Sequence, residues 1–260
     1  MPPSKIVLLA ACRCAKAKVL VGVVYYLFYY LFIVLAMQLS ISLVGPTLYV
    51  AGTLLLLPGC TLLLDRYAQQ FYAAAIYFLV AATALLTTAA IADFAVAARS
   101  LSKYYKASNY IDDAAAQKLT AKLMDADEEE ETQGSPNLLV PYLMLQGGIL
   151  FLAGSILYLP SVARNVLGTW VFRTGTCSYL AGSFFSWRAL AKSPGGVFSN
   201  CRVFFGILAF IAGALLYLAG GILSEMHLPG FAETWVAGSI FFVAGALAFA
   251  SSSFAHHRSP

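Results

Sequence analysis

The fold of this chain is decided by one apolar phrase that occurs three times. The clearest copy is GGILFLAGSILYL at residues 147–159, and GILAFIAGALLYL at 206–218 repeats it. A more divergent copy is GPTLYVAGTLLLL at 45–57. In all three copies, glycines recur at a seven-residue step, which is nearly two turns of an α-helix. The repeated glycines therefore share one helix face.

The composition around these copies is that of a membrane protein. Hydrophobic residues make up 60% of the chain and charged residues 11%, and the mean hydropathy is +0.78. The apolar runs are continuous rather than alternating, which excludes a β-barrel, and their length suits helices that cross a bilayer. We therefore expect an all-α integral membrane protein with about seven transmembrane helices. They are predicted near 18–37, 41–64, 69–97, 138–160, 166–187, 202–223 and 231–254.

The predicted helices group into three tandem helical hairpins preceded by one N-terminal helix. The predicted segments are a basic N-terminus with a lone transmembrane helix at 1–40, a divergent hairpin at 41–98, a polar loop with a short amphipathic helix at 99–137, a hairpin at 138–192, and a last hairpin with the C-terminal tail at 200–260. The polar loop contains an acidic run at 125–131. We expect this run to be solvated, and a docking surface for a basic neighbour is the alternative.

The second helix of each hairpin also has small residues at the seven-residue step. We align Gly175 and Gly182 with Gly238 and Gly245, and with Ala75 and Ala82 of the first hairpin. Small residues on one face allow two helix backbones to approach closely, which matters because lipid gives no hydrophobic drive for helix pairing. The predicted helix-packing residues are Gly147, Gly154, Gly175, Gly182, Gly206, Gly213, Gly238 and Gly245.

The second and third hairpins resemble the YrhK-like membrane domain, a small family built as a two-helix hairpin. The resemblance rests on residues 147–160, on LGTWVF at 167–172 and on 175–182, and it recurs in WVAGSIF at 235–241. It implies a hairpin at 138–187 and another at 202–254, and it implies no catalytic residue. The first hairpin departs from the pattern because it has alanines in place of the later glycines and no tryptophan.

Ionisable residues within the apolar segments are the first candidates for function, because their burial in a membrane is costly. Arg173 lies inside the predicted fifth helix, and Arg173 and Arg164 are candidates to bind phospholipid headgroups. The alternatives for Arg173 are an acidic partner on a neighbouring chain, or a side chain that snorkels to the interface. Asp93 is expected near the end of the third helix, and Glu225 and Glu233 are expected in water beside a turn.

Other residues give little indication of chemistry. The aromatic residues of the lone helix predict a surface that packs on lipid or on a partner protein, and they are Tyr25, Tyr26, Tyr29 and Tyr30. The five cysteines form no Cys-x-x-Cys pair and have no histidine at ligand spacing, so a metal site is not expected. Phosphate-binding loops, hydrolase motifs and paired haem histidines are absent from the sequence. We expect neither a cofactor nor an enzymatic activity.

The charges indicate an orientation in the membrane. The ends of the hairpins nearest the connecting segments, here called the bases, carry Arg99, Lys103, Lys106, Lys118, Lys122, Arg188, Lys192, Arg202 and Arg258. The turns within the hairpins, here called the tips, carry Arg66 and Arg164. Because positive residues favour the cytoplasmic side or its organellar equivalent, the bases are predicted to lie there. A spanning first helix would put the lysines at 5–18 on the opposite side, which conflicts with the same rule.

These observations predict a non-catalytic accessory subunit of a larger membrane complex. Residues 1–64 contain no acidic residue, a composition that fits an organellar protein, so the mitochondrial inner membrane and a respiratory or ATP-synthase complex are the predicted setting. The expected partners are other membrane protein subunits and phospholipids, and no nucleic acid is expected. The alternative is a small transporter or channel built from tandem hairpin repeats.

Overall fold

The computed structural model describes residues 41–109, 138–162, 164–193, 196–198 and 200–258, and this part of the chain is helical with short turns. The helices are α2 (Ile41–Thr61), α3 (Asp65–Asn109), α5 (Leu139–Leu157), α6 (Asn165–Lys192), α7 (Cys201–Glu225) and α8 (Phe231–Arg258). A short 3₁₀ turn, η1 (Gly196–Phe198), lies between α6 and α7. The predicted all-α fold is confirmed for these residues. The predicted lone helix at 18–37 lies outside them.

Five of the described helices are long and apolar enough to cross a membrane, which fits an integral membrane protein. The apolar spans are Leu43–Thr61, Asp65–Lys103, Leu139–Leu157, Cys201–Glu225 and Phe231–Ala255. α6 is long enough but is more polar than the others, because it carries Arg173 and a series of threonines and serines. Several of these hydroxyls bond to carbonyls of their own helix, as Thr176 does to Phe172 at 3.0 Å. Seven spanning helices were predicted, and within the described residues five helices meet the requirements of length and apolar composition.

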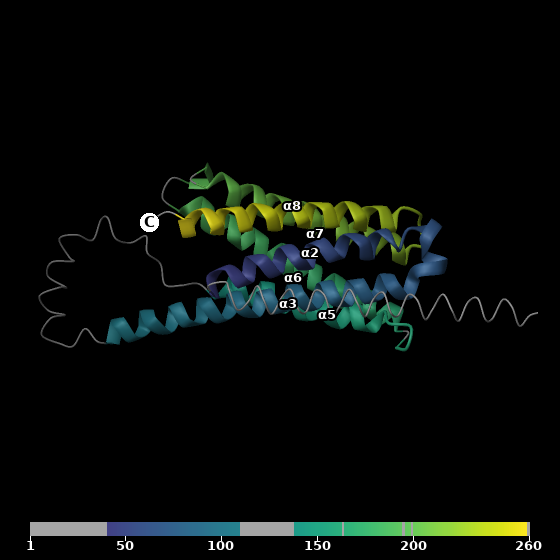
Figure 1. Cartoon of the computed structure of the whole chain (residues 1–260), viewed down its shortest axis with the longest axis horizontal. Helices are drawn as coiled ribbons and strands as arrows, with labels where there is room; N and C mark the ends of the chain where they lie inside the picture. The colour runs from purple at the N-terminus through teal and green to yellow at the C-terminus, as the bar shows by residue number, and fades with distance from the viewer. Residues whose placement is uncertain (1–40, 110–137, 163, 194–195, 199, 259–260) are drawn as a thin grey trace, which may run out of the picture.

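The helix ends agree with the predicted ranges to within a few residues, except at the end of α3. This helix was expected to finish at 97, but it continues to Asn109. At 1.5 Å per residue its 45 residues measure about 67 Å, roughly twice the hydrocarbon thickness of a bilayer. The first residues of the predicted polar loop at 99–137 are thus helical, and α3 projects past the other helices at the base end (Figure 1).

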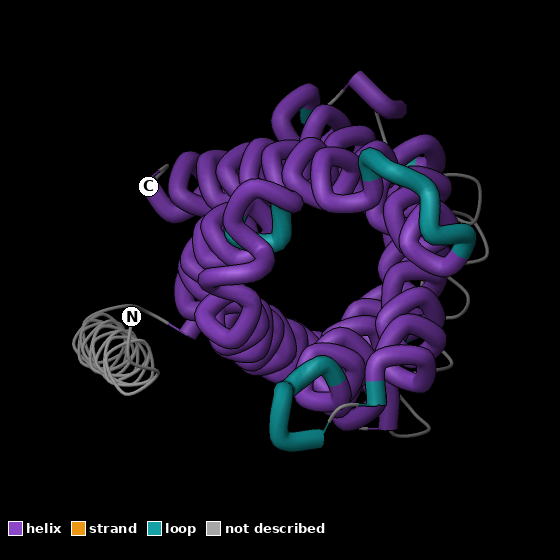
Figure 2. Tube along the Cα trace, turned by 90° about the vertical axis from the view of Figure 1, so that its right-hand side faces the viewer, coloured by secondary structure: helices purple, strands orange, loops and turns teal. Residues whose placement is uncertain are grey.

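The six helices form a closed ring of three hairpins (Figure 2). α2 pairs with α3, α5 with α6, and α7 with α8, and the second helix of each hairpin contacts the first helix of the next. The ring closes where α8 contacts α2. All three tips lie at one end of the ring and the bases at the other (Figure 1).

Aromatic side chains fill the interior of the ring. Phe151 of α5 stacks on Phe172 of α6 with ring centroids 4.5 Å apart, and Phe172 stacks in turn on Tyr217 of α7. Tyr217 also stacks on Trp235 of α8, and its hydroxyl lies 3.2 Å from the Sγ atom of Cys60 on α2. Tyr217 also meets Phe151 of α5, with ring centroids 6.4 Å apart. Because α2 and α5 are not ring neighbours of α7, the contacts of Tyr217 with Cys60 and Phe151 cross the interior. Tyr217 therefore ties three hairpins together at their common centre.

The three hairpins repeat one set of internal contacts. The middle glycine of each copy faces the next helix at an equivalent place: Gly52 at Leu86, Gly154 at Phe172 and Gly213 at Phe242. The hydrogen bond between the hydroxyls of Tyr158 and Thr169 recurs between Tyr217 and Ser239, at 2.7 Å in both hairpins. The hairpins are therefore related as three similar units around the axis of the ring.

This correspondence corrects the alignment of the second helices. The carbonyl of Gly175 approaches Gly147, whereas Gly245 approaches the equivalent glycine Gly206, so Gly175 corresponds to Gly245 rather than to Gly238. The alignment based on the seven-residue step was two helical turns off. The physical reason is that α7 runs on to Glu225, more than two turns beyond the point that matches the end of α5. A seven-residue glycine pattern fits both registers equally well.

Candidate functional site

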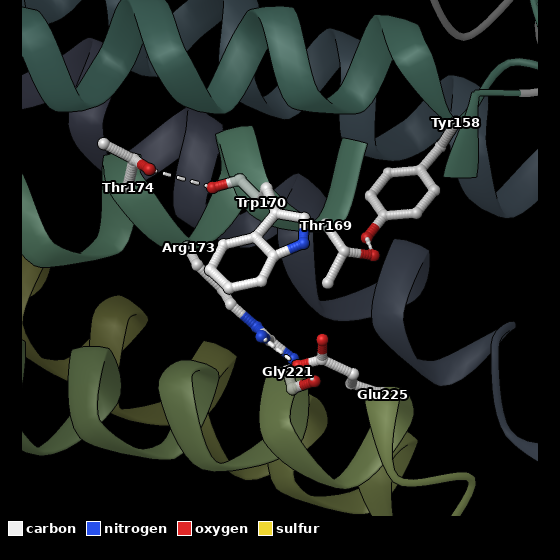
Figure 3. A network of polar contacts seen from close by, with 7 residues as sticks. All are labelled: Tyr158, Thr169, Trp170, Arg173, Thr174, Gly221 and Glu225. Atoms are coloured by element: carbon white, nitrogen blue, oxygen red, sulfur yellow. Dashed lines mark hydrogen bonds and ion pairs between the residues drawn. The ribbon is translucent and has the colours of Figure 1, made fainter. Parts of the chain in front are cut away.

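Arg173 forms a polar network between the second and third hairpins (Figure 3). Its Nη1 atom donates to the carboxylate of Glu225, and its Nη2 atom donates to the carbonyl of Gly221, both on α7. The guanidinium also lies over the ring of Trp170, with the Cζ atom 5.4 Å from the ring centroid. The Arg173 side chain is 13% exposed, whereas the Glu225 side chain is 51% exposed. Arg173 and Glu225 form the ion pair that is found among the described residues.

Local geometry explains why the arginine reaches α7. The extra turns at the end of α7 bring Gly221 and Glu225 alongside α6, and no such extension exists on α5. Gly221 also leaves room, because a Cβ atom at this position would lie 3.0 Å from the Nε atom of Arg173. The Nε atom is buried without a hydrogen-bond partner. Two of the donor groups of the guanidinium are thus used to join two hairpins.

The surroundings of Arg173 hold α6 in place. The hydroxyl of Tyr158, which follows α5, shares a hydrogen bond with the hydroxyl of Thr169 on α6, and burial raises the pKa of this tyrosine. Thr174 donates to the carbonyl of Trp170 at 2.9 Å (Figure 3). These bonds are uncharged and local. The arrangement as a whole fixes the position of the Arg173 guanidinium near the tip end of the ring.

The network changes the interpretation of Glu225 and of Arg173. Glu225 is half exposed, in agreement with its expected place in water, and it also binds Arg173 across 52 residues of sequence. The acidic partner of Arg173 therefore lies on the same chain and not on a neighbouring one. Arg164 lies exposed at the N-cap of α6. Phospholipid binding by Arg173 and Arg164 stays a prediction.

The eight glycines predicted to pack helices all lie at the seams within their own hairpins. Backbone oxygens lie close to where a side chain would begin: a Cβ atom on Gly154 would lie 3.2 Å from the carbonyl oxygen of Gly168, and one on Gly213 would lie 3.0 Å from that of Gly238. Gly182 contacts Met144 of α5. The remaining glycines of the set are Gly147 and Gly175 in the second hairpin and Gly206, Gly238 and Gly245 in the third, each against the facing helix.

Asp93 is a residue whose position was not foreseen. It was expected near the end of the third helix, but α3 continues well past it, and Asp93 is half-buried with its carboxyl group against Gly45 of α2. The signal in the sequence was an acid within an apolar run, but the residue of α2 that it faces depends on the register of α3 against α2, which the glycine pattern leaves open.

Two other sets of candidates can be placed briefly. The aromatic residues Tyr25, Tyr26, Tyr29 and Tyr30 lie outside the described residues. Within the described ranges, no group of three or more histidine, cysteine or acidic side chains is arranged to hold a metal ion. The cysteines of this part of the chain, Cys60, Cys177 and Cys201, are not joined by disulfides.

Comparison with protein-family models, with curated proteins and with solved structures finds no match to this chain. The resemblance of the second and third hairpins to the YrhK-like domain rests on the residues quoted above and stays a prediction. The geometry therefore has to support any functional conclusion by itself.

Proposed function

We propose that this protein is a non-catalytic accessory subunit of a larger membrane complex. The observation that carries the proposal is the packing around Tyr217. This side chain is 2% exposed and contacts residues of α2, α5, α6 and α8, so the centre of the ring is filled where the three hairpins meet. A ring with a packed aromatic centre is suited to act as a rigid body rather than as a passage.

The outer faces of the ring are suited to contact with lipid and with other subunits. Large apolar side chains point outward at Phe205 on α7, Val166 and Trp170 on α6, and Ile240 on α8, each more than half exposed. Bilayer lipids cover such surfaces by default, and a partner subunit competes for part of them by close packing. The proposed partners are other membrane subunits and phospholipids, in the mitochondrial inner membrane and in a respiratory or ATP-synthase complex. The absence of acidic residues from 1–64 supports that setting.

Site-specific photo-crosslinking in native membranes tests this proposal. A photoreactive phenylalanine analogue at Phe205, which is 64% exposed, is expected to give crosslinks to other proteins. The same analogue at Phe151, which is 2% exposed and faces the interior, is the matched control and should crosslink within the chain. Extraction in mild detergent followed by native gels should then place the protein in a species much larger than itself. A free small species in native gels, together with no intermolecular crosslink from outward positions, would refute the accessory role.

A small transporter is the second candidate, and one observation favours it. The three hairpins are similar units around one axis, which is an arrangement used by transporters with parallel repeats, and a carboxyl group lies within the described ring at Asp93. Flux of a substrate in proteoliposomes that depends on Asp93 or Arg173 would support this candidate over the accessory role. Equal leakage from protein-free and protein-containing vesicles for a panel of ions and small metabolites would count against it.

A further inference from the structure

Exposed basic side chains gather at the base end of the ring. They lie on α3, α6 and α7, and they are Arg99, Lys103, Arg188, Lys192 and Arg202. Among the described residues, the one acid away from the tips is Asp93, which is half-buried with its carboxyl group against Gly45. The tip end differs, because exposed acids there offset its arginines, and these acids are Asp65, Glu225 and Glu233. The described base is therefore positively charged, whereas the tips carry charges of both signs.

The basic residues are most concentrated where α6 ends and α7 begins. Arg188 and Lys192 lie four residues apart at the end of α6, and Arg202 is the second residue of α7. The two helices are in contact, and the 3₁₀ turn η1 between them contacts both. Within the described residues, none of the three side chains forms an ion pair, and Arg202 donates to the carbonyl of Ser251 at 3.4 Å. Because arginine has five donors and lysine has three, most of their donors remain available to an anion.

Large aromatic side chains precede the basic residues on the same helix. Phe184 is 49% exposed and Trp187 is 40% exposed, and their rings meet edge to face with centroids 5.9 Å apart. On α5, the other helix of this hairpin, Tyr142 is exposed at the same end. Tryptophan and tyrosine are enriched where the hydrocarbon core meets the headgroups, and the charged ends of lysine and arginine lie on the outer side of that boundary. The order of residues at the end of α6 is therefore that of a membrane interface.

The length of α6 places its basic end at the level of lipid headgroups. The helix has 28 residues and measures about 42 Å at a rise of about 1.5 Å per residue. A bilayer is about 40–45 Å thick with its headgroup layers and about 30 Å thick without them. The last turn of α6 therefore reaches the headgroup layer at the base. Lipid phosphates are the anions that every part of such a layer offers, whereas an acidic protein would first have to displace them.

We propose that the surface formed by Arg188, Lys192 and Arg202 binds the headgroups of anionic phospholipids, with Phe184 and Trp187 against the upper part of the acyl chains. The three cations attract the negative charge, and the aromatic rings set the depth of the lipid. Arg173, by contrast, is already compensated by Glu225. The proposal deepens the function proposed above, because it names the class of phospholipid and the surface that selects it, and it rests on the membrane setting of that function.

Two tryptophans at opposite ends of α6 allow the lipid preference to be measured at each end. Trp187 at the base and Trp170 at the tip are both exposed, whereas the third tryptophan of the chain, Trp235, is 6% exposed. The full-length protein is reconstituted as Trp170→Phe, which leaves Trp187 as the exposed reporter, or as Trp187→Phe, which leaves Trp170. Quenching by phosphatidylglycerol with brominated acyl chains is compared with quenching by brominated phosphatidylcholine. At Trp187 we expect a preference of about fivefold for phosphatidylglycerol, equivalent to about 1 kcal/mol for one basic residue beside a headgroup, and at Trp170 a ratio of about one.

Charge variants in the Trp170→Phe background then locate the preference. Replacing Arg188, Lys192 and Arg202 together by glutamine should bring the ratio at Trp187 to about one, and Arg188→Gln alone should lower it, which keeps the test usable if the triple variant does not fold. Arg66→Gln is the matched control, since it removes an exposed arginine at the tips and should leave the ratio unchanged. In about 1 M sodium chloride the Debye length falls to about 3 Å, so the preference should be lost there as well.

Equal quenching by the two lipids at Trp187, a preference that survives in both charge variants, or the same preference at Trp170 would overturn the proposal. An acidic protein would be the partner instead if the purified protein shows no lipid preference and the triple variant loses a larger species on native gels of its membranes. The accessory role is tested by crosslinking from outward positions and by native gels of the wild-type protein. Either proposal can therefore fail without the other.

Discussion

Arg173 on α6 and Glu225 on α7 form an ion pair that joins the second hairpin to the third, because α7 continues at the tip more than two turns past the point that matches the end of its counterpart α5. The arginine is largely buried and also donates to the carbonyl of Gly221. Among the described helices of the ring, α6 is the one that is not apolar enough to count as a membrane span by composition. The pair therefore compensates the charge that Arg173 places within α6.

Replacing the two partners should have unequal effects. Arg173→Met keeps an apolar stem but loses both hydrogen bonds, and it is expected to reduce the stability by about 2 kcal/mol. Glu225→Gln should cost about 1 kcal/mol or less, because the half-exposed carboxylate is screened by solvent. Tm measurements in detergent check this order. Arg164→Met, which removes an exposed arginine near the same tip, is the control and should leave the Tm unchanged. Equal losses from all three variants would argue against the network.

The glycine seam of the third hairpin makes a second prediction. A Cβ atom on Gly213 would lie 3.0 Å from the carbonyl oxygen of Gly238, and a backbone group cannot move aside without separating the helices. Gly213→Leu is therefore expected to lower the stability by about 3 kcal/mol. Ala219→Leu on the same helix is the matched control, since Ala219 is exposed and the added side chain meets lipid or detergent. The measurement is again the Tm, and similar values for the two variants would contradict close packing at this seam.

The helices and hairpins could be predicted from the sequence because they depend on local pattern. Apolar runs of sufficient length mark the spans, and glycines at a seven-residue step mark the faces that pack within a hairpin. α6 was predicted as a helix in spite of Arg173, since the repeat placed it as the second arm of a hairpin. These features need no knowledge of how the hairpins are arranged.

The relationships between hairpins could not be predicted in this way. The partner of Arg173 lies 52 residues away, and its identity depends on the length of α7 at the tip. The surroundings of Asp93 depend on the register of α3 against α2, which a repeated glycine step leaves open by two turns. Closure of the ring by α8 against α2 is a contact between the two ends of the described chain, and no local pattern specifies it.

Tyr217 provides a third prediction, because its counterpart Tyr158 makes the same kind of hydrogen bond in a less buried position. The Tyr217 hydroxyl lies between Ser239 and Cys60 in the packed centre, whereas the Tyr158 hydroxyl meets Thr169 near the tip end. Tyr217→Phe is expected to cost about 1.5 kcal/mol, and Tyr158→Phe less than about 1 kcal/mol. Unfolding in detergent compares the two. A larger loss from Tyr158→Phe would mean that the three hairpins are not held together at Tyr217.

Tyr217→Ala extends the same test to the thiol of Cys60, which is fully buried. Loss of the aromatic ring opens space beside this thiol, so its reaction with a small maleimide should become several-fold faster than in the wild type. The measurement uses a variant in which Cys60 is the single cysteine. A rate that does not change would show that other side chains shield the thiol.

The arrangement of tips and bases predicts which residues lie on each side of the membrane. Exposed basic residues of the described bases are Arg99, Lys103, Arg188, Lys192 and Arg202, against Arg66 and Arg164 at the tips. Positive residues are retained on the cytoplasmic side or its equivalent, so the bases are expected to lie there.

In a background without the five native cysteines, a single cysteine at Ser100 or Lys192 reports on the base end, and one at Met226 or Val162 reports on the tips. A membrane-impermeant maleimide applied to sealed, uniformly oriented vesicles should label the two base positions from the positive side and the two tip positions from the opposite side. Permeabilised vesicles, in which all four positions should react, are the control. Because α2, α5 and α7 run from base to tip and α3, α6 and α8 return, labelling of Ser100 and Met226 from one and the same side would contradict three spanning hairpins.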